Sequence, residues 1–280
     1  MSRHRGRIIS GVPSTIDSSR PHPARFYDYW LGGRDNYLPD RRLGDEIASY
    51  IPGIRAMARA NRAFLGRAVR YAITELGITQ FLDIGTGLPT ARNVHQVAQD
   101  VDPEARVVYV DNDPIVLAHA RALMSGTPQG RTAFILADLR DPDSILNDPT
   151  LAETIDLDRP VAIMLVAVLM YFREADNPHG IIARLLDAVP SGSCLVITYP
   201  TADVDPKGAD LAAQACERAG ITMALRTRAE TETLFTGTDL VDPGVVHLDD
   251  WHPELAEAPL FEPDPYSGPA WAYAGLGRKP

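Results

Sequence analysis

The sequence contains little cysteine and no long apolar segment. Cys194 and Cys216 are the only cysteines among the 280 residues, and they are not closely spaced. This pattern excludes a zinc cluster built on paired cysteines and is typical of the reducing cytoplasm. No uninterrupted apolar run approaches the roughly 20 residues of a membrane-spanning helix, and no apolar core of a signal peptide precedes Pro13. We therefore expect a cytoplasmic protein that does not span a membrane.

An excess of positive charge is also missing. The chain has 27 Lys and Arg against 37 Asp and Glu, which gives a formal net charge of −10 at pH 7. Because contacts to nucleic-acid phosphates need clustered Lys and Arg, we do not expect a nucleic acid as the main partner. The His and Asp residues of segment 247–252 lack a third ligand at metal-binding spacing, so we expect no metal site.

Residues 81–90, Phe-Leu-Asp-Ile-Gly-Thr-Gly-Leu-Pro-Thr, form the segment around which the chain is organised. Apolar residues up to Asp83 predict a short buried strand. Gly85 and Gly87 let the backbone turn sharply and leave room for a ligand, and Pro89 suits the first turn of a helix. A strand, a glycine turn and a helix in this order open a nucleotide site at the carboxyl end of the first strand of an α/β sheet.

Two further predicted strands end in acidic residues. The second strand ends at Asp111, close to the roughly 20-residue offset from Gly87 at which a carboxylate meets ribose hydroxyls. The third ends at Asp138, where an adenine amino group could be recognised. Each Asp alone is more often a turn former. Together with the glycines, these acids favour a nucleotide-like ligand.

The glycine pattern indicates which nucleotide-like ligand the site binds. The dinucleotide fingerprint needs a third glycine beside a pyrophosphate, and Thr90 occupies that position. Pro89 also removes an N–H group that would bind phosphate. The segment therefore favours S-adenosylmethionine, which has no phosphate, over NAD, and an NAD-dependent oxidoreductase is the less favoured alternative.

These motifs, together with Val-Tyr-Val-Asp-Asn-Asp-Pro at 108–114 and Ala-Asp-Leu-Arg-Asp at 137–141, resemble a bacterial family of S-adenosylmethionine-dependent methyltransferases, formerly a domain of unknown function. The resemblance extends to 24–33, 58–65, 242–246 and 275–280 and covers nearly everything after the first twenty residues. It implies a doubly wound, mostly parallel α/β fold of Rossmann type. We expect a seven-stranded sheet of class I methyltransferase type, with an antiparallel last strand and an N-terminal helical lid segment.

The chain order predicts three parts: a mobile tail over 1–23, a lid segment over 24–54 and the methyltransferase domain over 55–280. In the domain we expect helices over 55–76, 90–99, 114–124, 181–189, 205–219 and 229–235. A long buried strand is expected over 160–169, a strand interrupted by a turn over 240–248, and the last strand over 270–276. Residues 25–42 carry aromatic side chains around Gly32-Gly33, namely Phe26, Tyr27, Tyr29, Trp30 and Tyr37. They could cover a flat ligand, or belong to a helix that docks on the main domain, or do both.

The expected site follows from these motifs and from the resemblance. The expected cofactor-binding residues are Asp83, Gly85, Thr86, Gly87, Asp111, Asn112, Asp138, Leu139, Tyr27 and Asn61. Tyr171 and Tyr29 are expected to face the substrate. Members of the family often carry His at the position of Tyr171, so no catalytic base is assigned.

The expected function is S-adenosylmethionine-dependent methyl transfer to a small-molecule acceptor. Methyl transfer depends mainly on alignment and the exclusion of water, so the missing catalytic triad does not count against it. The alternative is a non-catalytic protein that senses the ratio of S-adenosylmethionine to S-adenosylhomocysteine. The sequence leaves the acceptor and the oligomeric state open.

Overall fold

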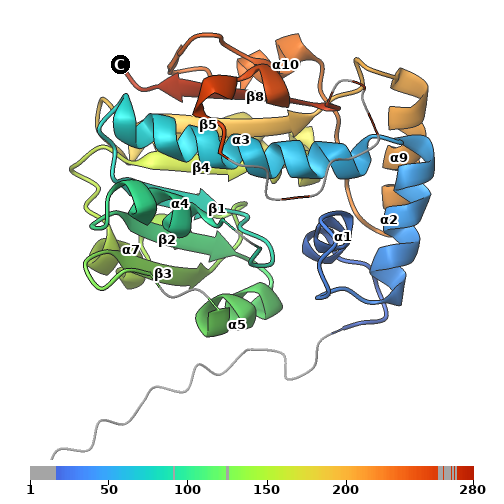
Figure 1. The fold of residues 1–280 in the computed structure, drawn as a ribbon, viewed down its shortest axis with the longest axis horizontal. Coiled ribbons are helices and arrows are strands. Elements are labelled where there is room, and N and C mark those ends of the chain that lie inside the picture. The colour runs from blue at the N-terminus through green and yellow to red at the C-terminus, as the bar shows by residue number, and fades with distance from the viewer. Residues whose placement is uncertain are drawn as a thin grey trace, which may run out of the picture.

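The computed structural model describes residues 17–90, 92–123, 126–257, 261, 266, 268 and 270–280. Across these residues a mixed sheet (Figure 1) has eight strands in the order β3-β2-β1-β4-β5-β8-β6, with β7 also paired to β8. The strands from β3 to β5 in this order are parallel, whereas β8 is antiparallel to β5, β6 and β7. The strands are β1 (Gln80–Ile84), β2 (Arg106–Asp111), β3 (Arg131–Leu136), β4 (Ala162–Val166), β5 (Cys194–Pro200), β6 (Asp239–Leu240), β7 (Val246–His247) and β8 (Ala272–Arg278).

This sheet confirms the expected fold class, a doubly wound and mostly parallel sheet with an antiparallel last strand. The expected sixth strand is interrupted by a turn, as its sequence indicated. Gly244 has a positive φ of 83°, and its N–H donates to the carbonyl of Val241 at 2.8 Å. The turn divides the strand into β6 and β7, which is why the described residues form eight strands where seven were expected.

Apolar side chains cover both faces of the parallel strands. Phe81 and Met164 belong to one buried cluster, whereas their neighbours Leu82 and Leu165 belong to another. This alternation follows from the strand geometry, in which successive side chains point to opposite faces. A sheet that is apolar on both faces must be covered by helices on both sides.

The helices form the two covering layers. On the first face lie α3 (Ile54–Thr74), α4 (Val94–Val101) and α9 (Pro206–Arg218). On the second face lie α6 (Pro142–Leu146), α7 (Pro149–Thr154), α8 (Pro178–Asp187) and α10 (Arg228–Thr233) with the residues after it. Helix α5 (Pro114–Leu123) packs against β2 and β3. The short helices α6 and α7, each of which begins with Pro after an Asp cap, were not expected from the sequence.

Helix α3 runs along the sheet (Figure 1) and confirms the helix expected over 55–76. Its buried Arg67 donates from Nε to the carbonyl of Trp251 at 2.8 Å and from Nη2 to that of Leu248 at 2.6 Å. Burial lowers the pKa of Arg67. These bonds fix the segment after β7 to the helix. Within the part of the chain that the structure describes, every helix is too short or too polar to span a bilayer.

The N-terminal helices α1 (Pro23–Trp30) and α2 (Leu38–Tyr50) lie beyond the carboxyl ends of β1 and β2 (Figure 1). A buried ion pair joins them, with Arg25 Nε 3.2 Å from Asp40 Oδ1. The same carboxylate accepts from the backbone N–H groups of His22 and Tyr37, both at 2.8 Å. Asp40 therefore holds the entry to α1 in place. Residues 1–16 of the expected tail lie outside the described residues.

The helix expected from residue 90, with Pro89 in its first turn, begins later. Helix α4 starts at Val94 after a cap by Asn93, so Pro89 lies in the preceding loop. The side chain of Asn93 accepts from the backbone N–H of Thr90 at 3.3 Å. Arg62 on α3 donates to the carbonyl of Arg92 at 2.9 Å. These contacts hold the loop open between the glycine turn and α4, so the prediction for Pro89 was wrong.

Asp40→Ala tests the anchoring of the N-terminal helices. The variant leaves Arg25 buried without its carboxylate, so we expect a loss of about 3–5 kcal/mol in the free energy of unfolding. Asp45→Ala is the matched control on α2, because its ion pair with Arg55 is exposed and should contribute less than about 1 kcal/mol. Urea unfolding of both variants measures the difference. Equal losses would contradict an anchoring role for Asp40.

Candidate functional site

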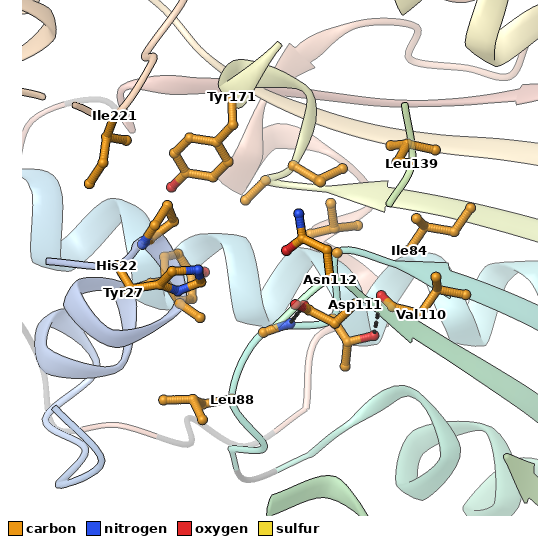
Figure 2. Close-up of a pocket in the computed structure, with 18 of the residues that line it drawn as sticks. His22, Tyr27, Ile84, Leu88, Val110, Asp111, Asn112, Leu139, Tyr171 and Ile221 are labelled. Atoms are coloured by element: carbon orange, nitrogen blue, oxygen red, sulfur yellow. Dashed lines mark hydrogen bonds between the residues drawn. The ribbon is translucent and has the colours of Figure 1, made fainter. Parts of the chain in front are cut away.

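A cavity of about 490 Å³ lies at the carboxyl ends of β1, β2, β3 and β4. Figure 2 shows Asp111 and Asn112 on one side of it and Tyr171, Ile221 and Tyr27 on the other. The strand order reverses between β1 and β4, and ligands of doubly wound sheets bind at such a switch point. The volume is within the range of about 300–1,000 Å³ that is typical of small-molecule sites.

The glycine turn after β1 forms the floor of the cavity. Gly85 has a φ of +78°, and a Cβ atom there would lie 2.4 Å from Cγ2 of Val168. Gly87 has a φ of +67°, and its N–H donates to Asp111 Oδ2 at 2.9 Å. The hydroxyl of Thr86 donates to the carbonyl of Asp83 at 3.1 Å. Any larger residue at either glycine would strain the turn, and at Gly85 it would also clash with Val168.

Asp111 ends β2 with its carboxylate held between two backbone N–H groups. Oδ2 accepts from Gly87, and Oδ1 accepts from the N–H of Asp113 at 2.9 Å. Burial raises the pKa of Asp111, although the two N–H groups oppose the rise. Asp113 caps α5, because its Oδ1 accepts from the N–H of Ile115 at 2.8 Å. Its Oδ2 lies 3.4 Å from Nδ1 of His22 in the N-terminal segment.

Asp138 and Asn112 form the rim beside the end of β3. The amide of Asn112 lies 3.4 Å from Asp138 Oδ2. The guanidinium of Arg140 pairs with Asp138 at 3.3 Å and with Asp176 at 3.4 Å, and it donates to the carbonyl of Tyr171 at 3.1 Å. The positive charge of Arg140 is therefore balanced by two carboxylates at this edge.

Asp83 is a buried carboxyl group in the lining of the cavity. Burial raises its pKa to about 7; the charge of Arg62 opposes this rise and that of Asp111 adds to it. Its carboxylate accepts no hydrogen bond from the residues that the structure describes. A cationic ligand group close to this carboxyl would favour its ionised form and would be attracted to it.

Helix α3 presents Asn61 and Arg62 to the same region. The amide of Asn61 donates to the hydroxyl of Tyr27 at 2.8 Å, and that hydroxyl donates to the carbonyl of Ala58 at 3.1 Å. Asn61 Oδ1 is buried and has no hydrogen-bond partner among the described residues. Buried polar atoms rarely lack a partner, so this oxygen marks a place for a ligand donor.

The cavity continues past the end of β4. Tyr171 and Phe172 follow this strand, and Ile221 and Thr222 follow α9. The two segments are joined by a hydrogen bond of 2.8 Å from the N–H of Ala224 to the carbonyl of Met170. Within the described ranges, no three His, Cys, Asp or Glu side chains form a cluster that could hold a metal ion.

The structure brings most of the expected site residues to this one cavity. Its lining includes all ten expected cofactor-binding residues and the substrate-facing Tyr171, namely Asp83, Gly85, Thr86, Gly87, Asp111, Asn112, Asp138, Leu139, Tyr27, Asn61 and Tyr171. Whether each contacts a cofactor stays a prediction, because the lining shows position only.

Tyr29 does not line the cavity, so its expected place facing the substrate was wrong. Its hydroxyl donates to Asp45 at 2.8 Å, and Arg55 lies 5.4 Å from the centre of its ring. Residues two apart on a helix point in nearly opposite directions, so only Tyr27 of this pair can face inward. Phe26 and Trp30 are buried in the apolar core. The aromatic segment therefore both docks on the domain and contributes one ring to the cavity.

Several lining residues were not expected from the sequence. His22, Arg140 and Ile221 come from loops or helix ends whose position depends on tertiary contacts. Arg62 had a local signal, because it follows Asn61 on the helix that precedes the glycine turn. His22 and Ile221 carry no motif that would have identified them, whereas Arg140 belongs to the quoted motif at 137–141.

Comparisons with known proteins agree with this architecture. The model of a family described as S-adenosyl methyltransferase matches residues 10–280. The crystal structure of a DUF574 family protein from Streptomyces avermitilis is 43% identical, with a TM-score of 0.88 over 95% of this chain and 100% of that chain. A provisionally assigned methyltransferase from Thermobifida fusca is also 43% identical, with a TM-score of 0.83 over 94% of this chain and 96% of that one. Among curated proteins the comparison found no match.

The family model covers nearly the whole chain, and the two structural relatives share its fold from end to end. The chain therefore belongs to the S-adenosyl methyltransferase family, whose cofactor is S-adenosylmethionine.

Proposed function

We propose that the protein catalyses methyl transfer from S-adenosylmethionine to a small-molecule acceptor. The observation that carries this proposal is the cavity itself, which joins the glycine turn and Asp111 to a further compartment beyond β4. A sensor of the cofactor would need only the first part. The continuation past β4 supports an enzyme that also admits an acceptor.

The residues of the cavity fit the cofactor. Asp111, Asn112, Asp138 and Leu139 line the cavity. We expect Asp111 to accept hydrogen bonds from the ribose hydroxyls and the other three to surround the adenine. Asn61 Oδ1, buried and without a partner among the described residues, suits an ammonium donor. An ammonium and a sulfonium also complement the buried carboxyl of Asp83.

The cofactor and the protein contribute different parts of the methyl-transfer reaction. When bound, the cofactor supplies an activated methyl group on its sulfonium. The protein must bind and orient both reactants and exclude water. We assign the exclusion of water to residues 24–54 as a lid, together with the preceding turn, because Tyr27, Ala24 and His22 line the cavity from that side.

Calorimetry with S-adenosylmethionine and NAD tests the proposed ligand. We expect binding of S-adenosylmethionine and of S-adenosylhomocysteine and no binding of NAD, because Thr90 and Pro89 replace the elements that hold a pyrophosphate. Tight binding of NAD without a response to S-adenosylmethionine would contradict the proposal. Turnover with a panel of small hydroxyl and amine acceptors then separates an enzyme from a sensor.

Asp111→Ala tests the proposed ribose contact. Hydrogen bonds to a charged group contribute about 1.5–3 kcal/mol each, so the variant should weaken S-adenosylmethionine binding by roughly one to two orders of magnitude. Asp113→Ala is the control, because this residue caps α5. It should lower the melting temperature, by a loss of about 0.5–2 kcal/mol of stability, with a smaller effect on affinity. If Asp111→Ala kept its affinity for S-adenosylmethionine and Asp113→Ala lost it, Asp113 would be the residue that contacts the cofactor, which would contradict the proposal.

Asp83→Asn tests the buried carboxyl through pH. The folded-state pKa of about 7 lies above the ordinary value of 3.8. The ionised form therefore destabilises the fold, and the penalty grows as pH rises between these values and is full above the higher one. At 1.36 kcal/mol for each pKa unit, the penalty is at most about 4 kcal/mol. We expect the melting temperature of Asp83→Asn to exceed that of the wild type by clearly more at pH 8 than at pH 5, where the penalty is only about 1.6 kcal/mol.

Saturating S-adenosylmethionine should reduce this advantage at pH 8, because cationic groups of the cofactor stabilise the carboxylate of the wild type. Thermal melts of both proteins at the two pH values, with and without cofactor, measure the effect. A difference in melting temperature that stays constant with pH would show that Asp83 does not titrate as argued. If the cofactor did not change the difference in melting temperature between Asp83→Asn and the wild type at pH 8, Asp83 would not contact the cofactor as proposed.

A further inference from the structure

The part of the cavity beyond β4 has a distinct chemical character. Its walls come from Leu65 on α3, Tyr27 on α1, Tyr171 and Phe172 after β4, and Ile221 after α9. All these side chains are uncharged, and only the tyrosines carry a polar atom. Thr222, beside Ile221, adds a hydroxyl that already accepts from Arg173 Nε at 3.1 Å. The charged side chains in the described lining come instead from the N-terminal segment, α3 and the ends of the first three strands, and they are Arg20, Asp28, Arg62, Asp83, Asp111, Asp138 and Arg140.

Arg140 is a charged group that lies beside this compartment. Its guanidinium lies 4.5 Å from the centre of the Phe172 ring. The same guanidinium is paired with Asp138 and Asp176, so it offers no unbalanced charge to an acceptor. An ionised acceptor beside Phe172 would lose its hydration without gaining a free counter-ion from Arg140, which is unfavourable.

The hydroxyl of Tyr171 is the polar group available in the compartment. Figure 2 shows the ring directed into the cavity from the segment after β4. The hydroxyl makes no hydrogen bond to the residues that the structure describes, whereas that of Tyr27 already contacts Asn61 and Ala58. Burial raises the pKa of Tyr171 well above its usual value. The group is therefore a neutral hydrogen-bond donor at physiological pH.

The position of Tyr171 relates it to the proposed cofactor site. Val168, three residues earlier, packs on Gly85 so closely that a Cβ on the glycine would overlap it. The segment that carries Tyr171 is thus in direct contact with the glycine turn. An acceptor bound against Tyr171 would lie next to the groups assigned to the cofactor.

We propose that the acceptor is a neutral, ring-sized, largely apolar molecule with a hydroxyl group, and that Tyr171 binds this hydroxyl. The proposal rests on the methyltransferase function proposed above. A hydroxyl oxygen has two lone pairs, so it can accept from Tyr171 and keep one lone pair free. An amine nitrogen has a single lone pair, which the same hydrogen bond would occupy. The compartment therefore favours an alcohol or phenol over an amine, and a neutral molecule over a carboxylate.

Binding of matched probes to protein saturated with S-adenosylhomocysteine tests this proposal without turnover. The probes are 2-naphthol, 2-naphthylamine and 2-naphthoate, which share a ring system and differ in the polar group. We expect 2-naphthol to bind, and 2-naphthoate to bind at least about tenfold more weakly because its charge is buried without a partner. We expect 2-naphthylamine to bind comparably to 2-naphthol, because its nitrogen can accept the same hydrogen bond, but its single lone pair is then occupied. Calorimetry measures all three.

Tyr171→Phe removes the proposed hydrogen bond while keeping the ring. It should weaken 2-naphthol binding about three- to tenfold, the usual range for one neutral hydrogen bond, and leave the affinity for S-adenosylhomocysteine unchanged. Tyr29→Phe is the matched control, because Tyr29 lies on α1 outside the cavity lining, with its hydroxyl bonded to Asp45. It should change neither affinity.

The outcomes separate this proposal from the one it rests on. If S-adenosylhomocysteine does not bind the wild type, the methyltransferase proposal fails. If S-adenosylhomocysteine binds, three results contradict the acceptor proposal alone. These are no binding of 2-naphthol, equal binding of 2-naphthoate, and an effect of Tyr171→Phe no larger than that of Tyr29→Phe.

Discussion

The hydrogen bond from the N–H of Gly87 to the carboxylate of Asp111 is the contact on which the site depends. It joins the turn after β1 to the end of β2, and it requires a residue that tolerates the positive φ of Gly87. Two residues earlier, Gly85 admits Val168 from the end of β4. The ends of three strands are thereby held together around one cavity. A substitution in the turn would disturb both the proposed ribose side and the proposed acceptor side.

The N-terminal segment completes the site from outside the sheet. The buried pair of Arg25 and Asp40 fixes the entry to α1, and this entry carries His22 to within 3.4 Å of Asp113. Tyr27, one turn further, reaches Asn61 on α3. With this cover in place Asp83 is only 5% exposed, which is the physical origin of its raised pKa. The cover and the electrostatics of the cavity are therefore linked.

The sequence predicted the part of the site that local rules determine. Gly85, Gly87 and Asp111 follow from a strand, a turn and an acidic strand end, and these features depend on neighbours in the chain. The prediction for Tyr29 was wrong because the direction of a side chain depends on how the helix docks, which Phe26 and Trp30 decide by burial. Pro89 lies in a loop because the side chain of Asn93 accepts from the N–H of Thr90 and Arg62 on α3 donates to the carbonyl of Arg92. Ile221 reaches the cavity only through tertiary packing, which no motif encodes, and the direction of Arg140 depends on its contacts to Asp176 and Tyr171.

The central claim is that one continuous cavity places the cofactor at the ends of β1 to β3 and the acceptor beyond β4. The most direct measurement is a crystal structure of the full chain with S-adenosylhomocysteine. The account predicts electron density with the ribose hydroxyls within hydrogen-bonding distance of Asp111 and the sulfur directed toward the compartment of Tyr171. Density with the adenine in the Tyr171 compartment, or at a separate place on the protein, would contradict the claim.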